Sequence, residues 1–248
     1  MKKPRREKLI DRVNRQQHDL GEGDAERIIR AGKVRVDGAI VDKPGSLVSV
    51  DAAVDVGQGK EFVGRGAFKL LHAITTFQLS PRGSVCADVG SSTGGFTEVL
   101  LKFGASKVYA IDVGYGELDY KLRVDPRVVV MERTNARHIT TLPDQIAFVS
   151  IDVSFISLYK ILPVVKDWLA PGATVVALVK PQFEAAREEV EVGGIVRSGE
   201  VHRRVVQEIK ALALSLKFSV RGECESPILG GDGNKEFLLV LQSDGVGI

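Results

Sequence analysis

The chain has 248 residues, of which 44% are hydrophobic, and a formal net charge of +2. This composition predicts one large domain, or a large and a small one, with a real core, and it argues against intrinsic disorder. No apolar run reaches membrane-spanning length, the N-terminus lacks the apolar stretch of a signal peptide, and two cysteines make neither a disulfide framework nor a zinc site. We therefore expect a cytoplasmic protein with no membrane segment and no metal.

The beginning of the chain is basic. Residues 1–15 contain seven lysines and arginines against two acidic residues, whereas residues 61–248 are nearly neutral. A basic module joined to a near-neutral body suggests a polyanionic partner. A solvated basic tail would explain the same charges, so charge alone leaves both interpretations open.

Residues 1–58 are predicted to form a small α+β unit. The apolar positions indicate helices over residues 7–17 and 25–31, the second of them capped by Asp24. Apolar alternation over residues 34–41, interrupted by Asp37-Gly38, predicts a β-hairpin with a type I′ turn.

Two short helices followed by a hairpin resemble the αL-type RNA-binding motif of ribosomal protein S-four. The segment Gly32 to Gly38 matches the hairpin of that motif, but Gly21-Glu22 stands where the motif usually has Ser-Arg. The resemblance implies that exposed basic side chains contact RNA. The RNA-binding candidates are Arg5, Arg6, Arg27, Arg30, Lys33, Arg35 and, at the start of the next domain, Arg65.

A glycine-containing linker, residues 59–64, leads into a second predicted domain, residues 65–248. Its first helix is expected over residues 65–77. Strands are then expected at 84–89, 107–112, 127–132, 146–152, 173–179, 217–223 and 236–242, and helices at 96–103, 115–123, 158–169 and 200–216. Alternating β and α units predict an α/β, Rossmann-like domain with a mostly parallel sheet covered on both faces.

The segment Cys86 to Thr97 reads as a strand, a tight glycine turn and the start of a helix. Glycines allow a ligand to approach the backbone closely, and exposed N–H groups at a helix start bind anionic or polar ligands. The next strand ends in Asp112, where an acid suits hydrogen bonding to ribose hydroxyls. The pattern therefore predicts a nucleoside-containing ligand, although such glycines can also serve only to pack a helix on a sheet.

Four charged residues are expected near the edge of the sheet where ligands bind. Lys69 lies on the helix before the first strand, Asp152 and Lys180 end two strands, and Glu236 opens the last strand. Each has an ordinary alternative explanation, because strand-end acids often cap helices and strand-end lysines are often solvated.

The order of the motifs resembles that of the TlyA (haemolysin A) family of ribosomal RNA methyltransferases. The matching segments are Arg65–Leu70, Asp88–Thr97, Ala110–Gly116, Glu132–Arg137, Asp152–Ser157, Leu178–Glu184 and Glu236–Leu239. The resemblance implies a small RNA-binding domain followed by an FtsJ-like, S-adenosylmethionine-dependent Rossmann domain. It also implies ribose 2′-O-methylation by a Lys-Asp-Lys-Glu tetrad, whose positions match Lys69, Asp152, Lys180 and Glu236.

Residue chemistry suggests a role for each member of this tetrad. A desolvated lysine beside another lysine can act as a base, so we assign that role to Lys180. Asp152 would orient Lys180, Lys69 would hydrogen-bond the 2′-oxygen or a neighbouring phosphate, and Glu236 would hold the lysines in place. The cofactor-binding candidates are Asp88, Gly90, Ser91, Gly94, Gly95, Phe96, Asp112 and Asn135. Asn135 is expected near the adenine, although it could be only a turn residue.

The leading hypothesis is therefore S-adenosylmethionine-dependent 2′-O-methylation of ribosomal RNA, with cytidine as the nucleotide that the resemblance suggests. The partner is ribosomal RNA or a ribosomal subunit, and the sequence does not predict an oligomeric state. Three alternatives stay open at this point. They are a nucleotide-dependent dehydrogenase, a cytolysin, and an RNA-binding protein whose methyltransferase fold is catalytically weak.

Overall fold

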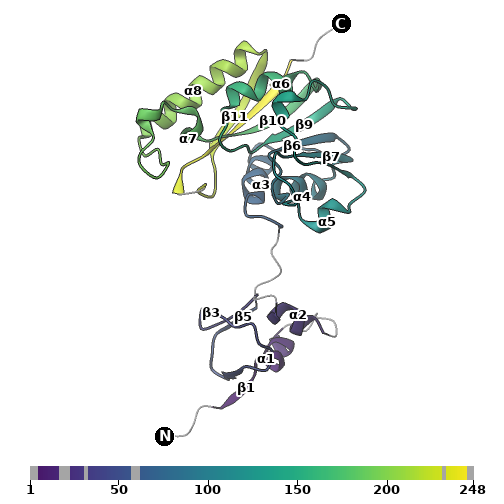
Figure 1. The fold of residues 1–248 in the computed structure, drawn as a ribbon, viewed down its shortest axis with the longest axis vertical. Coiled ribbons are helices and arrows are strands. Elements are labelled where there is room, and N and C mark those ends of the chain that lie inside the picture. The colour runs from purple at the N-terminus through teal and green to yellow at the C-terminus, as the bar shows by residue number, and fades with distance from the viewer. Residues whose placement is uncertain (1–4, 17–22, 31–32, 57–61, 231–232, 245–248) are drawn as a thin grey trace. The chain divides into compact units, whose positions relative to one another are not determined.

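The computed structural model describes residues 5–16, 23–30, 33–56, 62–230 and 233–244. Contacts within the chain divide it into two compact units, Met1–Glu61 and Phe62–Ile248 (Figure 1). Half of the linker predicted at 59–64 precedes Phe62, and that half, residues 59–61, lies outside the described residues. Gly21-Glu22 and Gly32, named above, and the last residues of the two expected helices, 17 and 31, also lie outside them.

The smaller unit contains two helices and two small sheets. Its elements are β1 (Arg6–Lys8), α1 (Leu9–Gln16), α2 (Asp24–Arg30), β2 (Val34–Val36), β3 (Ala39–Ile40), β4 (Leu47–Ser49) and β5 (Val54–Val56). Strand β1 pairs with β4, and the other sheet has the order β3-β2-β5. Leu9, Val13, Ile29 and Val34 belong to its buried core.

The helix expected from residue 7 starts at Leu9, because residues 6–8 pair with β4 instead. The second helix is confirmed over Asp24–Arg30, with Asp24 as its first residue and not as its cap, and the hairpin is confirmed as well. Asp37 and Gly38 have φ values of 50° and 83°, as both central residues of a type I′ turn require.

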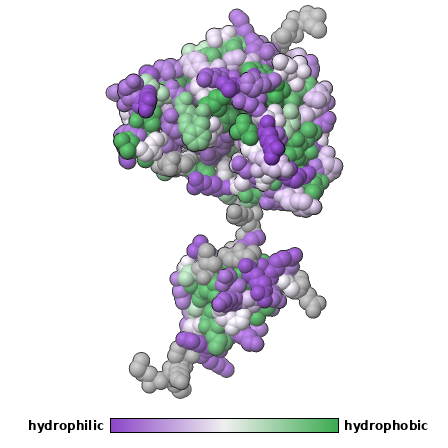
Figure 2. All heavy atoms as spheres, viewed as in Figure 1, coloured by the Kyte–Doolittle hydropathy of each residue, from purple (hydrophilic) through white to green (hydrophobic). Residues whose placement is uncertain are grey.

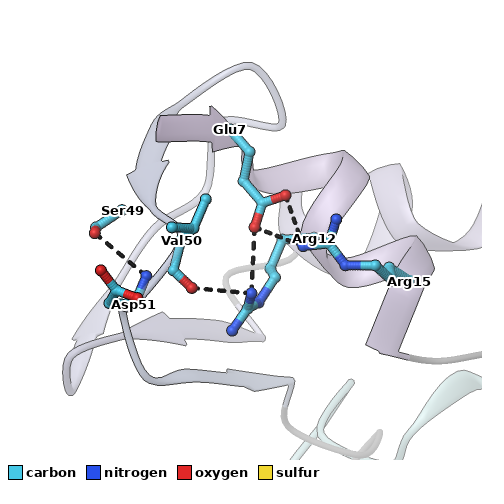
Figure 3. A network of polar contacts seen from close by, with 6 residues as sticks. All are labelled: Glu7, Arg12, Arg15, Ser49, Val50 and Asp51. Atoms are coloured by element: carbon cyan, nitrogen blue, oxygen red, sulfur yellow. Dashed lines mark hydrogen bonds and ion pairs between the residues drawn. The ribbon is translucent and has the colours of Figure 1, made fainter. Parts of the chain in front are cut away.

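Glu7 connects the first elements of the smaller unit through two arginines (Figure 3). Its carboxylate lies 2.6 Å from Arg15 Nη2 and 3.2 Å from Arg12 Nη1, and Arg12 also donates to the carbonyl oxygen of Val50. The hydrogen bond from Arg15 is the main reason that the pKa of Glu7 lies below its usual range. Two of the basic residues near the N-terminus are therefore used in holding β1, α1 and the segment after β4 together.

The larger unit is built on a mixed sheet of seven strands. The strands are β6 (Val85–Val89), β7 (Lys107–Ile111), β8 (Val128–Met131), β9 (Ile146–Ile151), β10 (Leu169–Val179), β11 (Phe218–Glu225) and β12 (Phe237–Ser243), in the order β11-β12-β10-β9-β6-β7-β8. Strand β12 runs antiparallel to both of its neighbours. All seven predicted strands and the Rossmann-like fold class are confirmed.

Helices cover both faces of this sheet (Figure 1). The main helical elements are α3 (Ala67–Thr76), α4 (Gly95–Lys102), α5 (Tyr120–Arg123), η2 (Leu158–Lys160), α6 (Leu162–Lys166), α7 (Pro181–Glu184), η3 (Arg187–Glu189) and α8 (Gly199–Ser215). Two apolar clusters form the core: one packs α3 and α4 against the sheet, and the other packs α6 and α8 against it.

Two predicted helices are shorter than expected. The segment from Tyr115 begins with a glycine turn, in which Gly116 has a φ of 75°, and α5 starts only after Asp119, whose side chain accepts from Lys121 N. The segment 158–169 divides into η2 and α6, and its last residue, Leu169, already belongs to β10.

The register of the strands decides where the polar residues emerge. Val89 lies beside Ile111 and Ile151 in parallel pairs, so the residues that follow β6, β7 and β9 leave the sheet at one edge. Val179 pairs with Phe237 of the antiparallel β12. Lys180, which follows β10, and Glu236, which precedes β12, therefore emerge at that edge too.

On the face seen in Figure 2, apolar residues reach the surface of the larger unit among hydrophilic ones. Such scattered exposure is normal in proteins. The most exposed large apolar side chains of the described residues include Tyr115, Phe155 and Val192. In the part of the chain that the structure describes, no helix has the length and apolar character needed to cross a membrane.

Candidate active site

The turn after β6 brings two strand ends together. Gly90 has a φ of 87°, and a Cβ added to it would lie 2.3 Å from the carbonyl oxygen of Asp152. Any residue with a side chain would therefore be strained and would also collide with the backbone after β9. This close approach sets Asp152 directly beside the glycine turn.

A cavity of about 940 Å³ opens at this edge of the sheet. Of the predicted cofactor residues, Gly90, Asp112 and Asn135 line it, together with Asp152 of the tetrad. Its wall also includes Ser92, Glu117, Arg137, Lys160 and the continuous segment 153–157, none of which the sequence singled out as a site residue. The cavity thus joins the turn after β6 to the ends of β7 and β9.

Asp112 is held in place by the backbone around it. One carboxylate oxygen accepts from Ser92 N at 2.8 Å and the other from Gly114 N at 2.7 Å. Each oxygen can accept a further hydrogen bond, so the group can still bind hydroxyl donors. Glu117 stands nearby, accepting from Ser92 Oγ at 3.1 Å, and gives the cavity a third carboxylate beside those of Asp112 and Asp152.

Asn135 serves as the N-cap of a short 3₁₀ helix, η1 (Ala136–His138). Its side-chain oxygen accepts from Arg137 N at 3.1 Å. It is therefore a turn residue, as the alternative reading held, and it also lines the cavity.

The four charged residues form one continuous chain of contacts. Lys69 Nζ lies 2.6 Å from Glu236 Oε2 and 3.7 Å from Asp152 Oδ2, and Lys180 Nζ lies 2.6 Å from Asp152 Oδ1. Lys69 and Lys180 are each 7% exposed and Glu236 is 2% exposed, so neither lysine is a solvated surface charge. Buried charges persist only when paired, and here each lysine has a carboxylate partner.

A smaller cavity of about 220 Å³ lies against this tetrad. Lys180 and Glu236 line it, as do Ser154, Phe155, Gln182, Phe183 and Gly194. Ser154 accepts a hydrogen bond from Lys180 Nζ at 3.0 Å. Gly230 makes room for Glu236, since a Cβ there would lie 2.1 Å from Glu236 Oε1. A buried tetrad with its own small cavity, next to a larger one, can hold two reactants side by side.

Comparison with known proteins identifies the family. Residues 62–243 match the FtsJ-like methyltransferase family, and residues 23–54 match the S4 domain. A Mycobacterium tuberculosis protein named 16S/23S rRNA (cytidine-2′-O)-methyltransferase TlyA is 44% identical over 88% of this chain and 83% of its own length. The chain belongs to the TlyA (haemolysin A) family of rRNA methyltransferases.

Other relatives of this TlyA-family chain agree. A Bacillus subtilis protein named as a candidate rRNA methyltransferase, YqxC, is 46% identical over 90% of this chain and 81% of its own length. The structure of a candidate haemolysin from Streptococcus thermophilus is 42% identical, covers 97% of this chain and 89% of its own, and gives a TM-score of 0.74. The family uses S-adenosylmethionine. Membership in this family therefore excludes the alternative of a nucleotide-dependent dehydrogenase.

Five predicted cofactor residues of this TlyA-family chain do not line the larger cavity: Asp88, Ser91, Gly94, Gly95 and Phe96. All five are buried. A Cβ at Gly94 would lie 2.2 Å from Leu122 Cδ1, and one at Gly95 would lie 3.0 Å from Ala67 N. These two glycines allow close packing of α4 against the segments leading to α3 and α5, and their contact with a cofactor stays a prediction.

Asp88 is fully buried beneath the glycine turn. It accepts from Thr97 Oγ1 at 2.7 Å and from Ser150 Oγ at 3.0 Å. Burial nevertheless raises the pKa of its carboxyl group to about 7.

We expect Asp88→Asn to change how stability depends on pH. A carboxyl group whose pKa is raised on folding stabilises the native state when protonated, and it loses this contribution as the pH rises toward the folded pKa. The variant should therefore gain stability relative to wild type by about 1.4 kcal/mol per pH unit between about pH 5 and pH 7. Urea unfolding across this range measures the difference, with Asp167→Asn, an exposed acid, as control. A difference that stays constant with pH would contradict the assignment.

All seven RNA-binding candidates of this TlyA-family chain are exposed. Some also have local partners: Arg27 pairs with Asp24, Arg30 pairs with Glu26, and Arg35 donates to the carbonyl oxygen of Gly38. Six of the candidates lie in the smaller unit, and Arg65 lies just before α3 in the larger one.

Proposed function

We propose that this protein transfers a methyl group from S-adenosylmethionine to the ribose 2′-hydroxyl of a cytidine in ribosomal RNA. The buried chain of Lys69, Asp152, Lys180 and Glu236 beside the larger cavity carries this proposal. The residue types suit activation of a hydroxyl, and the Mycobacterium tuberculosis relative, named as a cytidine-2′-O-methyltransferase, supports the choice of nucleotide.

In the proposed reaction the cofactor occupies the larger cavity, where Asp112 would accept hydrogen bonds from its ribose and Asn135 would border the adenine. S-adenosylmethionine supplies an electrophilic methyl group. Lys180 Nζ, unprotonated when it acts, would take the proton of the 2′-hydroxyl as that oxygen bonds to the methyl carbon, whose bond to sulfur would break and release S-adenosylhomocysteine. Asp152, 2.6 Å away, holds Lys180 in position.

The other two members support the same alignment. Lys69 donates a hydrogen bond to the 2′-oxygen or to an adjacent phosphate, and Glu236 holds Lys69 through the contact of 2.6 Å. Because the reaction joins two bound substrates, most of the rate gain comes from their alignment. The catalytically weak alternative is disfavoured, since all four side chains are paired, Lys69, Lys180 and Glu236 are buried, and Lys180 and Glu236 line a cavity.

The candidates of the smaller unit would dock structured RNA through its phosphates and shape. We place their target in ribosomal RNA or ribosomal subunits, and the protein in the cytoplasm. A domain of residues 1–58 would then supply docking, and one of residues 65–248 would supply chemistry.

The test is methylation of ribosomal subunits by the purified protein with labelled S-adenosylmethionine, followed by mass spectrometry of the nucleosides. The expected product is 2′-O-methylcytidine. Transfer to no RNA, or a methyl group found on a base, would refute the proposal.

Asp112→Ala is expected to weaken binding of S-adenosylmethionine by about 10- to 100-fold, because hydrogen bonds to a charged group contribute about 1.5–3 kcal/mol. Calorimetric titration of the cofactor measures the change. Asp167→Ala, which removes an exposed acid that does not line the cavity, is the control. If both variants bind like wild type, Asp112 does not hold the ribose.

A further inference from the structure

The two cavities of the larger unit share one wall. Ser154, Phe155 and Phe183 line both of them. On the proposed function, the cofactor occupies the larger cavity and the acceptor nucleotide the smaller one. Residues 153–157, which we call the partition loop, therefore lie where the methyl group must pass from one reactant to the other.

The partition loop is not held by regular secondary structure. It lies between the end of β9 and the start of η2. Phe155 has a φ of 61° and is 91% exposed, so its own packing cannot fix the loop in this unfavourable conformation. The loop needs side-chain contacts from elsewhere to keep its shape.

Val153 and Ile156 pack against the apolar core, and the polar and aromatic contacts of the loop come from one short segment, residues 180–184. Lys180 Nζ donates to Ser154 Oγ at 3.0 Å, and the ring of Phe183 lies 5.1 Å from that of Phe155. At the far end of α7, Glu184 accepts from Ser157 Oγ at 2.6 Å and from Leu158 N at 2.8 Å. The segment thus contacts the loop near both of its ends, at Ser154 and Ser157, and at Phe155 between them.

The contacts of Glu184 point to no role other than holding this loop. It lines neither cavity, so it touches neither reactant. Burial raises the pKa of its carboxyl group, although both hydrogen bonds favour the charged form. A half-buried carboxylate in that environment costs stability, and its two hydrogen bonds offset this cost only in part.

We propose that Glu184 is a positioning residue for methyl transfer, which rests on the proposed function: its grip on Ser157 and Leu158 fixes the partition loop, so that the cofactor methyl and the 2′-oxygen stay aligned. The alternative is a purely structural role, in which Glu184 only caps η2. The two differ in what the loss of the contact changes, because a cap affects stability whereas alignment affects kcat.

The experiment compares Glu184→Ala, Glu184→Gln, Ser157→Ala and the double alanine variant. Glu188→Ala, which removes an exposed glutamate from η3, is the control. For each we would measure kcat and KM with ribosomal RNA, the cofactor Kd, and amide hydrogen exchange over residues 152–158.

Glu184→Ala should lower kcat by about 10- to 100-fold, because small displacements of reacting groups have effects of this size. Its cofactor Kd should rise by a smaller factor, and exchange in the loop should become faster. Glu184→Gln should recover most of the rate, since its amide can accept from Leu158 N and donate to Ser157 Oγ. The double variant should resemble Glu184→Ala, because the two residues form one contact.

The proposal is overturned if Glu184→Ala keeps the wild-type kcat, or if it behaves like Glu188→Ala in loop exchange. It is also overturned if Glu184→Gln is as impaired as Glu184→Ala. A wild type that methylates no RNA would instead refute the proposed function, and the exchange measurement would still decide whether Glu184 holds the loop.

Discussion

Replacing Lys180 with alanine is expected to lower kcat for RNA methylation by about 100- to 10,000-fold, the range typical for loss of a general base. The Nζ atom of Lys180 lies 2.6 Å from Asp152, and Lys180 lines the cavity next to the tetrad. Cofactor affinity should change little, because Lys180 does not line the larger cavity. Single-turnover transfer of labelled methyl, with the cofactor Kd measured in parallel, separates the two effects.

Lys180→Arg is the matched variant. Arginine keeps a positive charge that can pair with Asp152, but it does not release its proton and cannot act as a base. We expect it to be about as inactive as the alanine variant while retaining more stability, since Lys180→Ala leaves Asp152 only its longer contact of 3.7 Å with Lys69. Wild-type turnover by Lys180→Arg would show that Lys180 acts only through its charge, and wild-type turnover by Lys180→Ala would remove it from the mechanism.

The strands were predictable because buried parallel strands are continuous apolar runs. Val108 to Ile111 and Val175 to Val179 are examples, and each run ends at a polar residue of the site, Asp112 or Lys180. The register then follows from the fold, which is why Asp152 and Lys180 could be expected at one edge. The distance of 2.6 Å between Lys180 Nζ and the Asp152 carboxylate could not be predicted, since it depends on side-chain conformations that no sequence pattern reports.

The role of each glycine was the least predictable feature of the site. Gly90, Gly94 and Gly95 belong to one motif, yet only Gly90 lines the larger cavity, while the other two permit helix packing. A glycine shows that no Cβ fits, but the sequence does not say whether a ligand or another part of the chain fills the space.

Site residues in irregular turns could not be predicted from the sequence for a related reason. Glu117 was expected in a helix from residue 115, but the glycine turn delays that helix to Tyr120 and leaves Glu117 at the cavity. The left-handed backbone at Phe155 likewise has no sequence signature. Loop positions of this kind depend on tertiary contacts, here those from residues 180–184.

Gly90→Ala is expected to have the largest effect of any conservative substitution at the turn. The methyl group would stand 2.3 Å from the carbonyl oxygen of Asp152, on a backbone whose φ of 87° already disfavours it. Because that neighbour is backbone, β6 or β9 must shift. We expect a loss of about 3–5 kcal/mol in the free energy of unfolding, a size seen when overpacking and strain combine.

Gly83→Ala separates the two causes. Gly83 also has a positive φ, 71°, but nothing lies within 4 Å of its added Cβ. It should therefore show only the conformational cost, about 1–2 kcal/mol. Urea unfolding of both variants gives the difference that belongs to the close approach.

Gly90→Ala should also lower the rate of methyl transfer. Asp152 follows β9 directly and holds Lys180, so a shift of its backbone moves the base relative to both cavities. For the fraction of Gly90→Ala that remains folded, kcat should fall by about 100-fold, the effect of a displacement near 1 Å. Equal stability losses in the two alanine variants would show that the β6 turn tolerates the methyl group. An unchanged kcat in folded Gly90→Ala would show that the contact with Asp152 does not position the tetrad.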